Sequence, residues 1–357
     1  MIQAAGYVLG IQPYVPGKPI EELERELGIS NSIKLASNEN PVGPSPAALA
    51  VIRESVADLN RYPDGGGFHL RQALSRSLRV AEDELILGNG SNELLDMAAR
   101  TFMRDGDEAV MATPSFVVYF MAAQSVGGVS VQVPLINYTH DLKAMGDAIT
   151  PKTKMIFIAN PNNPTGTING KKEFDEFMTR VSDDILVVVD EAYYEYVTDS
   201  GYADSMRHFR AGRNILILRT FSKIYGLAGL RIGYGIGPKQ VLSDMNRLRE
   251  PFNTNTLAQK AAVAALADAG HVRRSREVNE EGKQYLCKEL TAAGMSYVPT
   301  QANFIYMPVE DSKALYDGLL KKGVIIRPMG PGAVRVTIGL PEENRRFIDA
   351  LKAVVGD

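Results

Sequence analysis

Seven short runs of aliphatic and β-branched residues recur along the chain up to residue 235, with helical segments between several of them. Two runs, ILVVV at residues 185–189 and ILIL at 215–218, are apolar throughout rather than alternating with polar residues. Strands of this kind are covered on both faces. Their alternation with helices predicts a three-layer α/β domain built on a mainly parallel seven-stranded sheet. The expected strands are residues 84–87, 109–112, 130–133, 155–159, 185–189, 214–218 and 231–235.

The sequence changes character after residue 254. Helices are expected there at residues 257–268, 273–290 and 342–355, and shorter strands at 304–307, 324–327 and 334–338. These elements predict a second, smaller C-terminal α/β domain, in a chain of 357 residues that is too long for one small core. We therefore predict three parts, which are an N-terminal arm packing with the small domain (residues 1–40), a large domain (41–254) and the small domain (255–357).

Composition argues against several classes of function. The net charge of −3 does not indicate the excess of positive charge that is typical of nucleic-acid-binding proteins. Residues 109–139 are uncharged, but prolines and glycines divide them, so no membrane span is expected. The single Cys287 forms no internal disulfide and residues 1–13 lack a signal-peptide pattern, which together predict a cytoplasmic location. The four histidines lie far apart in the sequence, so no metal site is expected.

Polar clusters follow four of the expected strands, and in open α/β sheets ligands bind beyond the carboxyl ends of the strands. Residues 88–92 (Gly-Asn-Gly-Ser-Asn) open a predicted helix, which suits a phosphate. Residues 160–166 (Asn-Pro-Asn-Asn-Pro-Thr-Gly) form a rigid turn that presents amides. Asp190 ends a hydrophobic strand, where a carboxylate is costly unless a cation meets it. Residues 219–223 (Arg-Thr-Phe-Ser-Lys) bring a lysine and two hydroxyls to the last of these strand ends.

The four clusters fit one ligand, pyridoxal 5′-phosphate. It needs an amine for its aldehyde, a carboxylate for its ring nitrogen, a phosphate cradle and donors to its ring oxygen. Lys223 can supply the amine, and Asp190 can keep the ring nitrogen protonated. Asn163 and Tyr193 can reach the ring oxygen, and Phe116 can stack on the ring. The residues available for the phosphate are Gly90, Ser91, Asn92, Thr220, Ser222 and Arg231.

These motifs carry a family resemblance. Asn-Pro-Thr-Gly at residues 163–166, Asp-Glu-Ala-Tyr at 190–193 and Ser-Lys at 222–223, with Arg231 eight residues beyond the lysine, resemble the fold-type-I aminotransferases. Further segments narrow the resemblance to the histidinol-phosphate aminotransferase family and spread it over nearly the whole chain. They are PYVPGK at 13–18, KLASNENP at 34–41, RYPD at 61–64 and RVTIG at 335–339.

The resemblance implies roles for individual residues. Lys223 would form a Schiff base with the cofactor and then transfer protons. Tyr62 would reach across a homodimer interface to the cofactor phosphate of the other subunit. Arg335 would bind the α-carboxylate of glutamate. On the substrate side the resemblance adds Asn38, and it places Tyr14 and Arg327 at the distal anionic group. The loop at 64–67 (Asp-Gly-Gly-Gly) departs from the usual family pattern beside Tyr62.

The reaction implied is the transamination of L-histidinol phosphate with 2-oxoglutarate, giving imidazole acetol phosphate and L-glutamate in histidine biosynthesis. An aromatic amino-acid aminotransferase on the same scaffold is the alternative. A catalytically silent pyridoxal-phosphate-binding regulator is a rival of another class, although no DNA-binding region is appended. A NAD-dependent dehydrogenase is a third, but Glu93 stands where a dinucleotide loop needs its last glycine.

Overall fold

The computed structural model describes residues 2–356 of the chain. Its larger sheet has seven strands in the order β2-β8-β7-β6-β5-β3-β4. All neighbours in it pair in parallel except β8, which is antiparallel to both β2 and β7. Six strands therefore point the same way, which confirms the predicted fold class. The strands are β2 (Leu85–Gly88), β3 (Glu108–Thr113), β4 (Val129–Pro134), β5 (Thr153–Ala159), β6 (Leu186–Asp190), β7 (Ile215–Thr220) and β8 (Gly233–Ile236).

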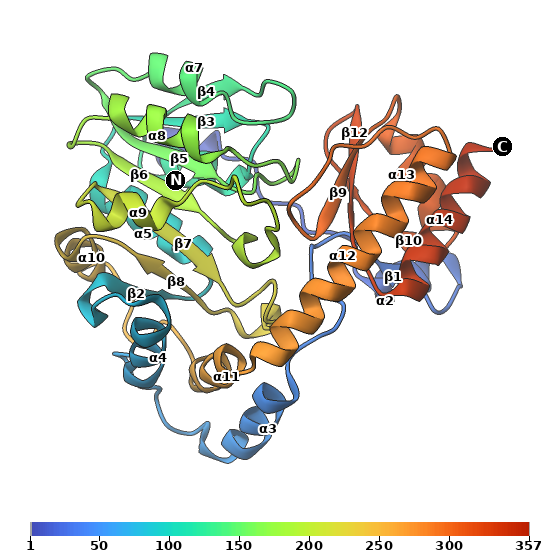
Figure 1. Ribbon diagram of the computed structural model, residues 1–357, viewed down its shortest axis with the longest axis horizontal. Helices are drawn as coiled ribbons and strands as arrows, with labels where there is room; N and C mark the ends of the chain where they lie inside the picture. Colours follow the sequence, from blue (N-terminus) through green and yellow to red (C-terminus); the bar gives the residue numbers. More distant parts are fainter. Residues whose placement is uncertain (1, 357) are drawn as a thin grey trace.

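Helices cover both faces of this sheet, as Figure 1 shows. The apolar run of β6 explains why. Val187 and Val189 pack in one buried cluster, and Leu186 and Val188 pack in a second cluster on the opposite face. The first cluster is completed by α3 (Pro46–Ser55), α4 (Phe68–Leu78), α7 (Leu142–Asp147), α8 (Lys171–Arg180), α9 (Ser205–Arg210) and α11 (Thr256–Ala267). The second is completed by α5 (Ser91–Phe102), α6 (Val117–Ser125) and α10 (Lys239–Asn246).

A smaller assembly lies beside the large sheet and is coloured orange and red in Figure 1. It contains a three-stranded sheet in the order β11-β12-β9 and a two-stranded pair of β1 with β10. Its core is separate from the two clusters of the large sheet. The elements are α12 (Ala269–Ala292), β9 (Phe304–Pro308), α13 (Ser312–Lys321), β10 (Val324–Ile325), β11 (Arg327–Pro328), β12 (Ala333–Thr337) and α14 (Pro341–Val355).

The N-terminal segment joins this smaller assembly. Its α2 (Ile20–Leu27) and β1 (Ile33–Lys34) follow a short α1 (Gly6–Leu9). β1 pairs in parallel with β10, through Ile33 opposite Val324. In Figure 1 the blue α2 and β1 lie beside the red elements, whereas α1 contacts α6 of the large sheet. The domain boundaries after residues 40 and 254 stay predictions.

One element differs from its expected form. A single strand was expected at residues 324–327, but β10 and β11 are separate because they pair with different partners, β1 and β12. A sequence run does not reveal such a change of partner. None of the helices among residues 2–356 is long and apolar enough to cross a membrane.

Candidate active site

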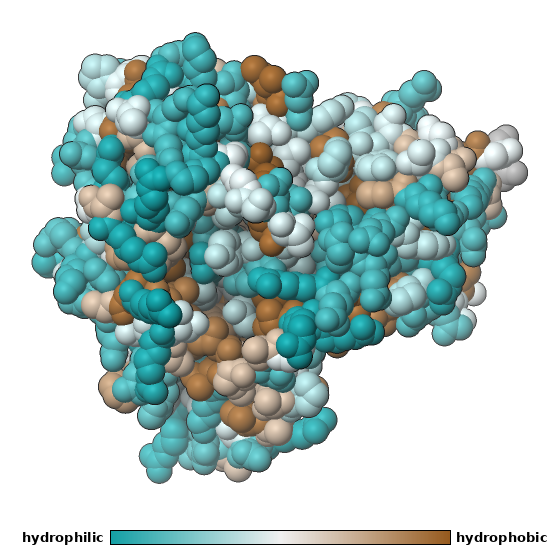
Figure 2. Space-filling model, viewed as in Figure 1, coloured by the Kyte–Doolittle hydropathy of each residue, from teal (hydrophilic) through white to brown (hydrophobic). Residues whose placement is uncertain are grey.

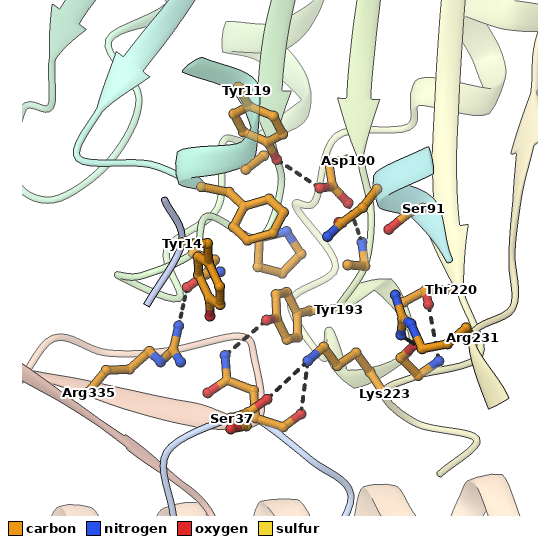
Figure 3. Close-up of a pocket in the computed structure, with 18 residues that line it drawn as sticks. Tyr14, Ser37, Ser91, Tyr119, Asp190, Tyr193, Thr220, Lys223, Arg231 and Arg335 are labelled. Atoms are coloured by element: carbon orange, nitrogen blue, oxygen red, sulfur yellow. Dashed lines mark hydrogen bonds between the residues drawn. The ribbon is translucent and has the colours of Figure 1, made fainter. Parts of the chain in front are cut away.

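A cavity of about 200 Å³ lies at the carboxyl ends of the parallel strands, where the small assembly meets the large sheet (Figure 3). Thirteen of the residues predicted for the site line it together. They are Tyr14, Asn38, Ser91, Asn92, Phe116, Asn163, Asp190, Tyr193, Thr220, Ser222, Lys223, Arg231 and Arg335. The prediction that the strand-end clusters converge is therefore matched by the geometry, whereas the role of each residue stays a proposal.

Lys223 follows β7 and points into this cavity from a half-buried position (Figure 3). Its ε-amine donates to the backbone carbonyls of Ser37 at 3.3 Å and Asn38 at 3.2 Å. Desolvation lowers the pKa of the amine to about 8, and the positive charge of Arg335 adds to the effect. A fraction of the amine is therefore neutral near neutral pH, which is the form that attacks an aldehyde.

Asp190 is the last residue of β6 and is 6% exposed. Its Oδ2 accepts a hydrogen bond from the hydroxyl of Tyr119 at 2.8 Å, and its Oδ1 accepts one from the backbone N–H of Ala192 at 3.1 Å. Burial raises the pKa of the carboxyl to about 6, and these two hydrogen bonds oppose the rise. A buried carboxylate of this kind is stabilised by a cation, such as a protonated ring nitrogen.

The N-terminus of α5 forms an anion cradle on the other side of the cavity. Ser91 begins this 12-residue helix, and Gly90 caps it with a φ of 78°. A Cβ on Gly90 would lie 2.4 Å from Nη2 of Arg231, so the guanidinium rests directly against this backbone. Nη1 of Arg231 also donates to Oγ of Ser222 at 3.2 Å. Backbone N–H groups, the helix dipole and a guanidinium converge here, as a phosphate requires.

Comparison with known proteins identifies the scaffold. The family model for aminotransferase class I and II matches residues 30–351, which is nearly the whole chain. The chain belongs to this aminotransferase family.

Individual relatives are similar over almost their full length. A histidinol-phosphate aminotransferase of Moorella thermoacetica is 52% identical, over 98% of this chain and 92% of the relative. Histidinol-phosphate aminotransferase 1 of Nitrosococcus oceani is 47% identical, over 99% of this chain and 96% of the relative. Among solved structures, the histidinol-phosphate aminotransferase of Sinorhizobium meliloti, in complex with pyridoxal-5′-phosphate, superposes with a TM-score of 0.92. It is 26% identical, and the match covers 100% of this chain and 98% of that one.

In this aminotransferase the small assembly contributes Arg335, a buried residue of β12. Its guanidinium donates to Oδ1 of Asn163 and to the carbonyl of Ala36, the latter at 2.8 Å. No carboxylate pairs with it within residues 2–356, and its Nε has no partner there. Burial lowers the pKa of Arg335 from its ordinary value. A buried guanidinium without a counter-ion suits an anionic group of a ligand.

Tyr193 and Asn38 both line the cavity and are in direct contact. The amide of Asn38 donates to the hydroxyl of Tyr193 at 2.9 Å, and burial raises the pKa of that hydroxyl. The backbone of Asn38 has a φ of 54° and donates to Oγ1 of Thr337 at 2.9 Å. Burial therefore keeps the predicted ring-oxygen donor Tyr193 neutral, and a residue of the N-terminal segment orients it.

Three predicted site residues do not line the cavity. Gly90 lies directly behind its wall, against Arg231. Arg327 stands beside the rim, with its guanidinium 5.4 Å from the ring centroid of Tyr14 and its Nη2 donating to the carbonyl of Val15 at 2.7 Å. Tyr62 is 82% exposed and stacks on Phe252, with ring centroids 4.7 Å apart.

Five residues that line the cavity were not predicted as site residues, which are Ser37, Tyr119, Ala159, Pro161 and Ala192. Tyr119 is the most important, since it bonds Asp190 and stacks on Phe157 at 5.0 Å. A signal for it existed. Phe116 caps α6, and a residue three positions further along a helix lies on the same side.

The residues present fit pyridoxal phosphate. A desolvated amine, a buried carboxylate, an aromatic wall at Phe116 and an anion cradle at a helix N-terminus line one cavity. Each matches one functional group of that cofactor.

Proposed function

We propose that this aminotransferase uses pyridoxal 5′-phosphate to transfer the amino group of L-histidinol phosphate to 2-oxoglutarate. The products would be imidazole acetol phosphate and L-glutamate, in histidine biosynthesis. The observation that carries the proposal is that Lys223 and Asp190 line one cavity together with the anion cradle of α5. The names of the relatives support the choice of substrate, and none reported above supports the aromatic alternative.

When bound, pyridoxal phosphate supplies an aldehyde and an electron-withdrawing ring. Lys223 would provide its neutral amine to the aldehyde and then carry a proton on Nζ during amino transfer. Asp190, which accepts a hydrogen bond from Tyr119, would stabilise the positive charge of the protonated ring nitrogen. Asn163 and Tyr193 would donate to the ring oxygen, while Ser91 and Arg231, among others, would hold the phosphate.

The two substrates differ in charge, because histidinol phosphate has no carboxylate whereas glutamate has two. Arg335 would bind the α-carboxylate of glutamate, since it is buried and no carboxylate among the described residues pairs with it. Arg327 and Tyr14 would bind the distal group of either substrate, because a guanidinium fork accepts a phosphate or a carboxylate alike.

We also propose that the enzyme is a homodimer in the cytoplasm. Tyr62 is 82% exposed and does not line the cavity of its own chain, which supports a role for it at the site of a second copy. We further propose that the chain divides into an N-terminal arm (residues 1–40), a large domain (41–254) and a small domain (255–357), with α11 of the last packing on the large sheet.

A visible spectrum of the purified protein loaded with pyridoxal phosphate tests the proposal. Histidinol phosphate should change the absorbance of the bound cofactor, and 2-oxoglutarate should restore it, because the amino group passes to the enzyme and on again. Phenylalanine should change it far less at equal concentration. A response to phenylalanine alone would favour the aromatic alternative.

The variant Lys223→Ala provides the control. It should still bind the cofactor through the cradle of α5 but should not complete the amino transfer, with a loss of at least about 10³-fold in rate. Full activity in this variant would contradict the assignment of Lys223. Binding of the cofactor without any response to amines would support the silent regulator.

A further inference from the structure

The side chain of Asn162 lies behind the wall of the active site and makes four hydrogen bonds there. It is 1% exposed. Its Oδ1 accepts from Oγ of Ser115 at 2.8 Å and faces Nε2 of His140 at 3.1 Å. Its Nδ2 donates to Oγ1 of Thr165 at 2.9 Å and to the carbonyl of Pro114 at 3.3 Å. An amide offers two donors and one oxygen with two lone pairs, so all of its capacity is used.

These bonds join two loops that form different walls of the cavity. Ser115 precedes Phe116 in the loop after β3, while Asn162 lies between Pro161 and Asn163 in the loop after β5. Phe116, Pro161 and Asn163 line the cavity, whereas Asn162 does not. Asn162 therefore ties the aromatic wall to the residue proposed to contact the ring oxygen, without touching the ligand space itself.

The geometry also fixes the protonation of His140. This residue is 4% exposed, and its Nδ1 is buried without a hydrogen-bond partner in the described part of the chain. Burial lowers the pKa of His140 to about 4, so the ring is neutral at ordinary pH. A neutral imidazole carries one N–H. Because only Nε2 has an acceptor, the proton lies there and is donated to Oδ1 of Asn162.

The backbone of His140 is fixed as well. Its carbonyl accepts a hydrogen bond from Nδ2 of Asn169 at 2.9 Å, and the backbone N–H of Asn169 donates to Oδ1 of Asn160 at 2.9 Å. Asn160 begins the same loop that carries Asn162. Hydrogen bonds thus connect the backbone of His140, the donor, to the loop that carries Asn162, the acceptor.

We propose that Asn162 is a positioning residue that sets the placement of Phe116 and Asn163 around the cofactor, and that His140 and Ser115 hold it as its two donors. The inference rests on the proposed function and goes beyond it, because neither Asn162 nor His140 contacts the ligand space.

Paired variants of the two donors test the inference. His140→Leu removes one donor, while His140→Gln places an amide N–H near the position of Nε2. Ser115→Ala removes the other donor, and it tests the same oxygen if His140→Leu does not fold. For each variant the dissociation constant of pyridoxal phosphate is measured by equilibrium dialysis, together with the pH midpoint of the absorbance of the bound cofactor and the melting temperature of the apoprotein.

His140→Leu and Ser115→Ala should each weaken cofactor binding roughly tenfold, as the loss of one buried hydrogen bond implies. They should also shift the absorbance midpoint, because Asn163 would no longer be held in place. His140→Gln should bring both values back toward those of the wild type. This return is the signature of positioning through a hydrogen bond.

His208→Leu is the matched control. His208 is also buried, and its Nε2 lies 2.7 Å from a carboxylate oxygen of Asp175 on α8, at residues that do not line the cavity. It should lower the melting temperature and leave the absorbance midpoint unchanged. If the His140 and Ser115 variants behave like this control, the inference is wrong while the proposed function stands. If the wild-type protein binds no pyridoxal phosphate, both are wrong.

Discussion

At the scale of the residue, burial raises the pKa of Asp190, and the hydroxyl of Tyr119 is the main group that opposes this rise. Tyr119 donates to its Oδ2, and the pKa of the buried carboxyl stands at about 6 against 3.8 for the free side chain. Since the pKa is raised in the folded state, Asp190 favours folding below about pH 4. That contribution is lost as the pH rises through 6. The apoprotein therefore carries a buried negative charge at neutral pH that the cofactor would neutralise.

Tyr119→Phe should raise the pKa of Asp190 further, because the hydrogen bond that lowers it is gone. The variant apoprotein should be less stable by about 1 kcal/mol near pH 4, where the hydrogen bond goes to a neutral carboxyl, and by roughly 2 kcal/mol at pH 8, where it goes to a charged one. Denaturant unfolding at both pH values measures this. The difference at pH 8 should vanish when Asp190→Leu, which leaves no acceptor for the Tyr119 hydroxyl, is introduced into both proteins. A difference that persists in that background would mean that Tyr119 acts through packing on Phe157 instead.

At the scale of the element, the N-terminus of α5 depends on the glycine that caps it. Gly90 has a φ of 78°, and any Cβ there would collide with the guanidinium of Arg231. Gly90→Ala should therefore displace Arg231 and strain the backbone, and weaken the binding of pyridoxal phosphate by roughly 10- to 100-fold. Equilibrium dialysis against the cofactor measures the change.

Gly212→Ala separates backbone strain from the displacement of Arg231 as causes of weaker cofactor binding. Gly212 has a φ of 79°, but a Cβ there would meet nothing within 4 Å. The positive φ is then matched while the collision is missing. This variant should lose some stability and keep the affinity for the cofactor. Equal losses of affinity in the two variants would show that the cradle does not depend on contact with Arg231.

Sequence patterns located the strands of the large sheet but not every residue at their ends. The runs in β6 and β7 were visible because both faces of each strand are buried, which leaves no polar position. Motif spacing then assigned the strand-end residues Asp190 and Lys223. Tyr119 and Asn162 were missed because their importance comes from partners distant in the sequence, Asp190 and His140. Hydrogen bonds of this kind exist only once the loops meet.

At the scale of the whole molecule, Tyr62 and its surroundings expose a surface suited to a second copy. Four large apolar side chains that are near Tyr62 in the sequence or stack on it are each about half exposed. They are Val56, Leu59, Phe68 and Phe252. A largely apolar groove between α3, α4 and α11 adds to this surface, with Val51, Leu70, Val263 and Ala264 among its lining residues. Figure 2 shows apolar residues gathered at the lower centre, where Figure 1 places α11 and α3.

Mixed dimers would show whether Tyr62 serves the other subunit. Lys223→Ala and Tyr62→Ala subunits should each be nearly inactive alone at limiting cofactor. A heterodimer of the two has one site with both Lys223 and Tyr62 intact, provided that Tyr62 crosses the interface. Random mixing should then restore about a quarter of the wild-type activity, since half of the dimers are mixed and each has one good site. If Tyr62 served its own chain, every site in the mixture would lack one residue, and no activity would return.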